Sequence, residues 1–305
     1  MVLTAPRARP SSAVAIIGGG AVGGWMAWIV DTAGHAVTLC VRNEMPALVV
    51  EAQGAIHSVP VAFATEPSML TPVPWVLLAT KAQDTASTAP WLARLVGPQT
   101  TLVVLQNGID HGARIAHLAP AARLLPTVLY IAAERTGKGH IIHRSGKRIV
   151  VPSGPVGAEF VSLLAGSPVE ILQTEDFRTS SWKKLLRNLA ANPLTALTER
   201  PIGILRHPDL HDLSRAILTE ALAVARAEGA HLTPDDVQAT LDLYTRYSAD
   251  GGTSMLHDRL AGRPLEHEYI TGAVVDAARR HGLPVPLNQG ILALLRGIGA
   301  ALPAP

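Results

Sequence analysis

Three glycines near the start of the chain have the spacing of a phosphate-binding loop. Gly18, Gly20 and Gly23 follow the apolar run 13–17 and precede a longer apolar run, 25–30. Between a strand and a helix, the first glycine permits a tight turn, the second lets backbone approach a pyrophosphate, and the third lets the helix pack closely on the strand. The N–H groups that begin such a helix attract phosphate. We therefore predict a dinucleotide site with contacts from Gly18, Gly20, Ala21, Val22 and Gly23.

The same stretch fits two other kinds of segment. Residues 13–30 carry no charged side chain, and this uncharged stretch is long enough to span a membrane. Two arginines precede it, as in a signal peptide. The glycines oppose both interpretations because they strongly disfavour a helix. A second strand is expected at 35–41, after Gly34 ends the helix, and this β-α-β unit favours the nucleotide site over a purely structural turn.

The end of the second strand indicates which dinucleotide binds. An acidic residue there would bind the adenosine ribose 2′-hydroxyl of NAD, whereas an arginine accommodates the 2′-phosphate of NADP. Here Arg42 and Asn43 follow the strand, and no acid occurs before Glu44. The pattern predicts NADP(H); a solvated arginine at a strand end is the alternative.

A second set of polar residues combines an ammonium with two amides. Lys184, Asn188 and Asn192 are spaced four residues apart, which places them on one face of a helix. Asparagine is a poor helix former, so two asparagines in one helix indicate a functional role for their side chains. Pro193 predicts that the helix kinks or breaks at Asn192. The alternative is an exposed polar face that also includes Arg187.

The elements that carry these residues alternate between strands and helices in the first half of the chain. Apolar runs predict strands at 13–17, 35–41, 75–80 and 101–105, a strand pair within 56–65, and helices at 45–52, 85–95 and 109–118. This alternation is typical of a doubly wound parallel sheet, whose ligands bind beyond the carboxyl ends of the strands. Four residues of interest fall at such ends: Gly18, Arg42, Lys81 and Asn107.

The pattern changes further along the chain. Strands are expected at 127–133, 139–143 and 148–151, with turns at 136–138 and 145–147, as an antiparallel extension of the sheet; a helix at 156–164 and a strand at 169–172 follow. Beyond 174 only helices are expected, at 177–191, 210–228, 234–247, 264–280 and 287–300. We predict a disordered tail over 1–12, an α/β Rossmann-type NADP-binding domain over 13–174 and an all-α substrate domain over 175–305, with the active site in the cleft between the domains.

Composition narrows the classes of partner. The 305 residues are 48% hydrophobic with a net charge of +2, which argues against a nucleic-acid or membrane partner. The single cysteine, Cys40, excludes an internal disulfide and favours a reducing cytoplasm. His207 and His211 have zinc-ligand spacing, but no third ligand accompanies them, so no metal site is predicted. A helical second domain is compatible with a homodimer.

Taken together, the motifs make the chain resemble the ketopantoate reductase (2-dehydropantoate 2-reductase) family. The resemblance spans 13 to about 290, with order and spacing intact. The matching motifs are Gly18-x-Gly20-x-x-Gly23, Arg42, Lys81-Ala82, Gln106-Asn107-Gly108, Trp182-x-Lys184-Leu185-x-x-Asn188-x-x-x-Asn192-Pro193-Leu194-Thr195, Ser254-Met255-Leu256-x-Asp258, Gly262-Arg263-Pro264-x-Glu266 and Gly282-x-x-x-Pro286.

The resemblance implies NADPH-dependent reduction of the 2-oxo group of ketopantoate, a small 2-oxo acid, in the pathway to pantothenate. It implies that Lys184 is the general acid and that Glu266 binds the nicotinamide ribose close to Lys184. Lys81 would line the cofactor side. The groups that would hold the substrate are Asn107, Asn188, Asn192 and Ser254.

Several positions depart from the family pattern. Thr253 stands where a serine is common, Leu265 where a threonine is common, and His267-Glu268 where Ile-Asp is usual. These departures leave the substrate open. Reduction of another 2-oxo acid, a related hydroxyacid or imine-forming dehydrogenase, and a non-catalytic NADP-binding sensor are the alternatives.

Overall fold

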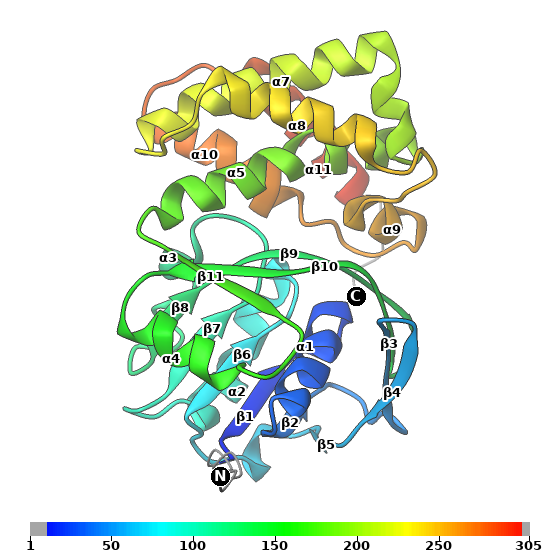
Figure 1. Ribbon diagram of the computed structural model, residues 1–305. Helices are drawn as coiled ribbons and strands as arrows, with labels where there is room; N and C mark the ends of the chain where they lie inside the picture. The colour runs from blue at the N-terminus through cyan, green and yellow to red at the C-terminus, as the bar shows by residue number, and fades with distance from the viewer. Residues whose placement is uncertain (1–10, 301–305) are drawn as a thin grey trace, which may run out of the picture. The chain divides into compact units, whose positions relative to one another are not determined.

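The computed structural model describes residues 11–300, so positions 1–10 of the predicted disordered tail lie outside the described residues. The chain divides into two compact units (Figure 1). The first takes residues up to 80, 84–106 and 111–175, and the second takes the remainder. Two short segments, Lys81–Gln83 and Asn107–Asp110, therefore follow strands of the first unit along the chain but belong to the second unit.

The first unit is built on a six-stranded sheet. In spatial order its strands are β5 (Val61–Ala64), β2 (Ala36–Cys40), β1 (Ala13–Ile17), β6 (Trp75–Leu78), β7 (Thr101–Val104) and β8 (Arg123–Pro126). Every neighbouring pair is parallel. The predicted doubly wound parallel sheet is thus confirmed, with β8 as a strand that the sequence patterns did not indicate. The strand order reverses between β1 and β6, which is where such folds bind ligands.

Both faces of this sheet are covered. Alternate residues of β1 point to opposite sides: Val14 and Ile16 join one buried cluster, and Ala15 and Ile17 join another. The helices of this unit are α1 (Ala21–Thr32), α2 (Ala89–Leu95), α3 (His111–Ile115) and α4 (Pro155–Leu163), with 3-10 turns η1 (Pro67–Met69) and η2 (Ala82–Thr88). Helix α1 supplies the first cluster, whereas α2 and α3 supply the second. Burial on both faces explains why these strands are continuous apolar runs.

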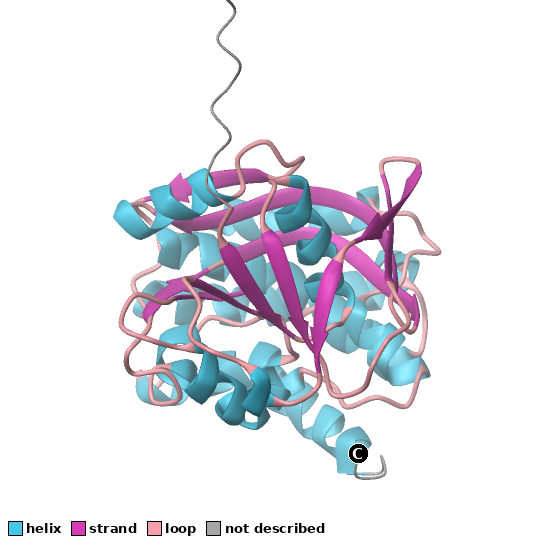
Figure 2. Ribbon diagram, turned by 90° about the horizontal axis from the view of Figure 1, so that it is seen from below, coloured by secondary structure: helices cyan, strands magenta, loops and turns pink. Residues whose placement is uncertain are grey.

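A second sheet packs into the α1 cluster. Its strands are β11 (Glu170–Thr174), β10 (His140–Pro152), β3 (Leu48–Ala52), β4 (Ala55–Val59) and β9 (Val128–Gly137). Figure 2 shows the strands of both sheets in magenta. Strand β10 pairs antiparallel with β9 and parallel with β3 and β11. The predicted antiparallel extension is therefore wrong in one respect, because these strands form a separate mixed sheet.

Two local predictions in this sheet are wrong. The segment 45–52 contains no helix; its residues Leu48–Ala52 form β3, in which buried and half-buried residues alternate. The predicted turn at 145–147 is a register shift inside the long strand β10. Gly146 has φ +76°, and a Cβ there would lie 2.1 Å from the carbonyl oxygen of Tyr130. The glycine thus permits a bulge rather than a chain reversal.

The second unit is helical around one large apolar cluster. Its elements are α5 (Phe177–Leu189), α6 (Ala191–Thr198), η3 (Ile202–Arg206), α7 (Pro208–Ala227), α8 (Pro234–Arg246), α9 (Ser254–Leu260), the π-helical η4 (Glu268–Gly272), α10 (Ala273–Arg280) and α11 (Pro286–Ala300). Helix α9 was not predicted. The helix expected at 264–280 starts later, so Glu266 lies in irregular backbone just before η4. Within residues 11–300, no helix is both long and apolar enough to cross a membrane.

The helix expected at 177–191 ends early. Helix α5 stops at Leu189, and α6 begins at Ala191 after a single linking residue. Pro193 explains the break, because it has no N–H for the carbonyl of Leu189 and its ring crowds that carbonyl. A break therefore occurs as predicted, but at Ala190 rather than at Asn192, so Asn192 lies on α6 whereas Lys184 and Asn188 lie on α5.

Candidate active site

The glycine loop has the backbone geometry that a dinucleotide site requires. Gly18 has φ +110°, a conformation that side chains disfavour, and its N–H donates to the carbonyl of Cys40 at 3.0 Å. A Cβ on Gly23 would lie 1.8 Å from the carbonyl oxygen of Gly18, so α1 packs too closely for any other residue. A Cβ on Gly20 would meet nothing within 4 Å. The backbone there is open to an incoming group.

The start of α1 and the end of β2 offer positive charge. Gly20 is the N-cap of α1 and supplies no side-chain acceptor, so the first N–H groups of the helix, at Ala21 and Val22, remain available to an anion. Arg42 follows β2 and is exposed. Among residues 11–300 its guanidinium takes part in no hydrogen bond or ion pair. These residues fit the pyrophosphate and the 2′-phosphate of NADP(H).

In the second unit, a buried carboxylate gathers three donors. Glu266 is 4% exposed. Its Oε2 accepts from Lys81 Nζ at 3.0 Å and from Asn107 Nδ2 at 3.2 Å, and its Oε1 accepts from the N–H of Ala82 at 3.2 Å. Three predicted site residues, Lys81, Asn107 and Glu266, are thus brought together. Glu266 therefore orients Lys81 and Asn107, in addition to any role in binding.

Asp258 is a member of this cluster that was not predicted as a site residue. Its Oδ2 accepts from Lys81 Nζ at 2.9 Å, and its Oδ1 accepts from Arg263 Nε at 2.9 Å. The spacing to Ser254, four residues along one turn of α9, was the available signal. Two cations and the two buried carboxylates alternate, so the cluster of Glu266, Lys81, Asp258 and Arg263 is neutral as a whole.

The backbone that carries Lys81 and Asn107 is held by a buried glutamine of the first unit. Gln106 Nε2 donates to the carbonyl of Thr80 at 3.1 Å, and its Oε1 accepts from Arg114 at 3.1 Å. Thr80 and Gln106 immediately precede Lys81 and Asn107 in the sequence. One side chain therefore links the two strand ends from which these site residues project. Gln106 was part of a recognised motif, but no role was predicted for it.

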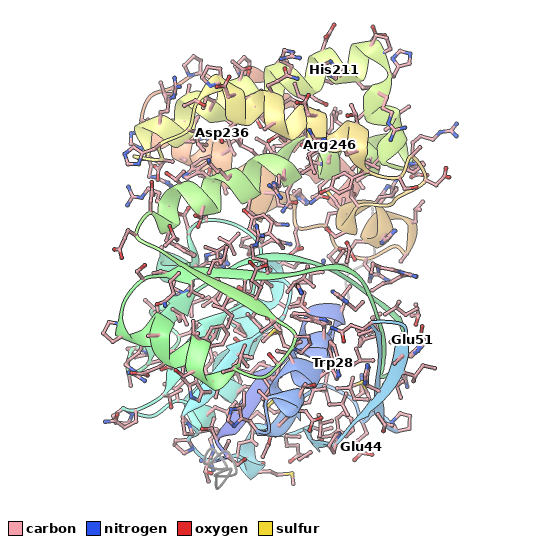
Figure 3. All side chains as sticks on the ribbon, in the orientation of Figure 1. Trp28, Glu44, Glu51, His211, Asp236 and Arg246 are labelled. Carbon is pink, nitrogen blue, oxygen red and sulfur yellow. The ribbon has the colours of Figure 1, made fainter. Side chains whose placement is uncertain are left out.

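Two adjacent lysines on α5 have different environments. Lys183 is exposed, and its Nζ lies 2.9 Å from Asp236 Oδ1 at the start of α8 (Figure 3). Lys184 is half-buried. Burial, followed by the positive charge of Arg187, lowers the pKa of Lys184 to about 8. An amine with this pKa is protonated at neutral pH but gives up its proton far more readily than an ordinary lysine.

Lys81 has the opposite electrostatic setting. Burial alone lowers its pKa, but the charges and hydrogen bonds of Glu266 and Asp258 outweigh burial, and the net pKa of Lys81 is raised. A proton donor works best with a pKa near the working pH, a condition that the lowered pKa of Lys184 meets and the raised pKa of Lys81 does not.

The remaining predicted residues are spread over three helices of the second unit. Asn188 is half-buried one turn after Lys184 on α5, Asn192 is buried at the start of α6, and Ser254 is exposed at the first position of α9. Helices α6 and α9 pack against each other. The arrangement offers amide and hydroxyl groups from different elements, which suits a small ligand with several polar groups.

Comparison with known proteins identifies a family. The family described as "Ketopantoate reductase PanE/ApbA" matches residues 14–155, and its C-terminal part, "Ketopantoate reductase PanE/ApbA C terminal", matches residues 176–299. The 2-dehydropantoate 2-reductase of Caulobacter vibrioides is 42% identical over 287 residues, which cover 93% of this chain and 98% of that protein.

Comparison with solved structures gives the same family. The PanE/ApbA family ketopantoate reductase from Ralstonia eutropha has a TM-score of 0.88 at 30% identity, covering 94% of this chain and 98% of its own. A dimeric ketopantoate reductase from Staphylococcus aureus has a TM-score of 0.85 at 26% identity, covering 95% of this chain and 100% of its own. The chain therefore belongs to the ketopantoate reductase family.

Proposed function

We propose that this chain is an NADP-dependent oxidoreductase that reduces the 2-oxo group of ketopantoate to the hydroxyl of pantoate, in pantothenate biosynthesis. The observation that carries the proposal is Lys184, a half-buried ammonium whose pKa is lowered to about 8. It occurs in a chain whose relatives bear the name 2-dehydropantoate 2-reductase. A sensor that only bound NADP(H) would have no use for such an acid.

The cofactor and the protein have separate tasks. NADPH, when bound, supplies the hydride. The glycine loop, comprising Gly18, Gly20, Ala21, Val22 and Gly23, holds the pyrophosphate, and Arg42 holds the 2′-phosphate. Lys81, Asn107 and Glu266 form the binding groups on the nicotinamide side, and their mutual hydrogen bonds set their orientation.

Substrate binding and proton transfer use the helical unit. Asn107, Asn188, Asn192 and Ser254 supply donors and acceptors to the substrate carboxylate and hydroxyl. Lys184 Nζ–H hydrogen-bonds the carbonyl oxygen, stabilises the negative charge that develops there during reduction, and then donates a proton to it. Lys184 and Glu266 are the two catalytic residues in this proposal.

The lowered pKa of Lys184 predicts the pH dependence of the reaction. A general acid must be protonated, so kcat/KM for ketopantoate should fall above pH about 8, by about tenfold per pH unit, as Lys184 loses its proton. An ordinary lysine, with a pKa of about 10.4, would keep the rate constant to much higher pH. Initial rates of NADPH oxidation across the pH range measure this profile.

Arg187 gives the matched control for the pH profile. Its charge is the second cause of the lowered pKa of Lys184, so Arg187→Ala should move the falling limb to higher pH and Arg187→Lys should not. A wild-type limb near pH about 10, or one that Arg187→Ala leaves in place, contradicts the assignment of Lys184 as the acid.

Substrate preference tests the choice among 2-oxo acids. Ketopantoate has a terminal hydroxyl that 2-oxoisovalerate lacks, and an unpaired buried amide costs about 1–3 kcal/mol. We expect kcat/KM for ketopantoate to exceed that for 2-oxoisovalerate by at least about tenfold. A higher kcat/KM with 2-oxoisovalerate or another unhydroxylated acid would replace ketopantoate as the substrate while leaving the reaction class unchanged.

We also propose a homodimer in the cytoplasm. The related enzyme from Staphylococcus aureus is described as dimeric, and the single cysteine is compatible with a reducing compartment. Cys40 is buried, and burial raises the pKa of its thiol to about 12, so it serves as a core residue rather than a nucleophile. Sedimentation velocity of the purified chain tests the oligomeric state; a single monomeric species contradicts the dimer.

A further inference from the structure

Two buried threonine hydroxyls join the helices that carry two of the proposed substrate-binding residues. Thr195 on α6 is 0% exposed and Thr253, the N-cap of α9, is 9% exposed; their Oγ1 atoms lie 2.7 Å apart. Thr195 follows Asn192 by three residues, and Thr253 directly precedes Ser254. The contact therefore lies beside both Asn192 and Ser254 along the chain.

The hydrogen bonds around this pair tie each hydroxyl to the backbone of its own helix. Thr195 Oγ1 lies 2.7 Å from the carbonyl oxygen of Ala191 and 3.1 Å from that of Asn192. Thr253 Oγ1 accepts from the N–H of Leu256 at 3.1 Å, which caps α9. The 2.7 Å separation makes the two hydroxyls one hydrogen-bonded pair, in which either can be the donor. Hydrogen bonds thus connect the start of α9, through Thr253 and Thr195, to the first turn of α6.

We propose that Thr195 and Thr253 are positioning residues that set the spacing between Asn192 and Ser254, and hence the fit of the substrate. This inference rests on the proposed function, in which those two side chains hold the 2-oxo acid.

Thr195→Val tests the bridge without disturbing the cap of α9. Valine keeps the shape and the burial, whereas Thr253 can still accept from the N–H of Leu256. We expect the KM for ketopantoate to rise about tenfold, equivalent to about 1.4 kcal/mol. The KM for NADPH should stay within about twofold of the wild-type value, because the substitution removes no group that binds the cofactor.

Three further variants separate positioning from a general loss of packing. Thr240→Val is the matched control. Thr240 is 5% exposed in α8, and its hydroxyl donates to the carbonyl of Asp236 at 2.8 Å. Like Thr195 it bonds the carbonyl four residues earlier in its helix, but among the described residues it does not contact a second threonine hydroxyl. Its KM for ketopantoate should match wild type. Thr195→Ser and Thr253→Ser each keep both hydroxyls and should keep the wild-type KM for ketopantoate. Thermal unfolding by circular dichroism confirms that each variant is folded.

The outcomes are distinguishable. A Thr195→Val variant that behaves like Thr240→Val, or that raises the KM for ketopantoate and NADPH equally, overturns the positioning role while leaving the proposed function intact. A raised KM for ketopantoate in both serine variants overturns it as well. A wild-type chain that reduces no 2-oxo acid overturns the proposed function itself.

Discussion

Replacing Lys184 with alanine is expected to lower kcat for ketopantoate reduction by at least about 100-fold, the low end for loss of a general acid. The ammonium stabilises the developing oxyanion and then protonates it, and no water molecule in its place has a comparable pKa. NADPH affinity, measured by fluorescence titration, should remain close to wild type. The effect should therefore appear in kcat rather than in cofactor binding.

Lys183→Ala is the matched control for this variant. Lys183 is the adjacent lysine on α5, but its charge is exposed and ion-paired with Asp236, so its removal should change kcat by less than about twofold. If Lys184→Ala keeps most of the wild-type rate, the assignment of the acid is wrong, and Lys81, the other lysine of the proposed site, becomes the candidate.

Replacing Arg42 with alanine is expected to change the choice of cofactor. Charge-assisted hydrogen bonds from a guanidinium to a phosphate contribute about 1.5–3 kcal/mol each. The KM for NADPH should therefore rise by about 10- to 100-fold, whereas the KM for NADH, which has no 2′-phosphate, should change little. Steady-state kinetics with each cofactor at saturating ketopantoate measure the two values.

Arg94→Ala provides the control for a change in net charge. Arg94 is exposed on α2 of the same unit and donates to the carbonyl of Ser68, so its loss should affect the two cofactors equally and weakly. If Arg42→Ala raised the KM for NADPH and the KM for NADH equally, Arg42 would not be the residue that binds the 2′-phosphate.

The parallel sheet could be predicted because its strands are buried on both faces. Residues such as Val76, Leu77 and Leu78 form an uninterrupted apolar run that ends abruptly at a polar residue, and periodicity is the strongest local signal. Helix α1 was equally predictable, since the glycine spacing before it and Gly34 after it mark a strand–helix–strand unit. Trp25 and Trp28, which are 0% and 5% exposed, are core residues of this helix.

The second sheet was harder to predict because tertiary pairing decides its structure. The segment 45–52 contains residues with helical propensity, but β10 and β4 pair with it and override that preference. Likewise, Gly146 has the composition of a turn, and only pairing with β9 shows that β10 continues through it. Strand β8 spans only Arg123–Pro126, which is too short to show a clear period.

The candidate site was predictable in its residue types but not in its contacts. Lys81 forms ion pairs with Asp258 and Glu266, which are 177 and 185 residues away along the chain. No local sequence pattern predicts an ion pair between residues so far apart along the chain. Proximity of Lys81 to two carboxylates, rather than its position at a strand end, explains why its pKa is raised while that of Lys184 is lowered.

The central claim is that this chain turns over ketopantoate with NADPH, and product stoichiometry tests it most directly. Purified wild-type chain is incubated with NADPH and ketopantoate, NADPH oxidation is followed by absorbance, and pantoate is quantified by mass spectrometry. We predict that each molecule of NADPH consumed yields one molecule of pantoate. A chain that binds NADPH but forms no pantoate, with or without NADPH loss, would contradict the proposed function.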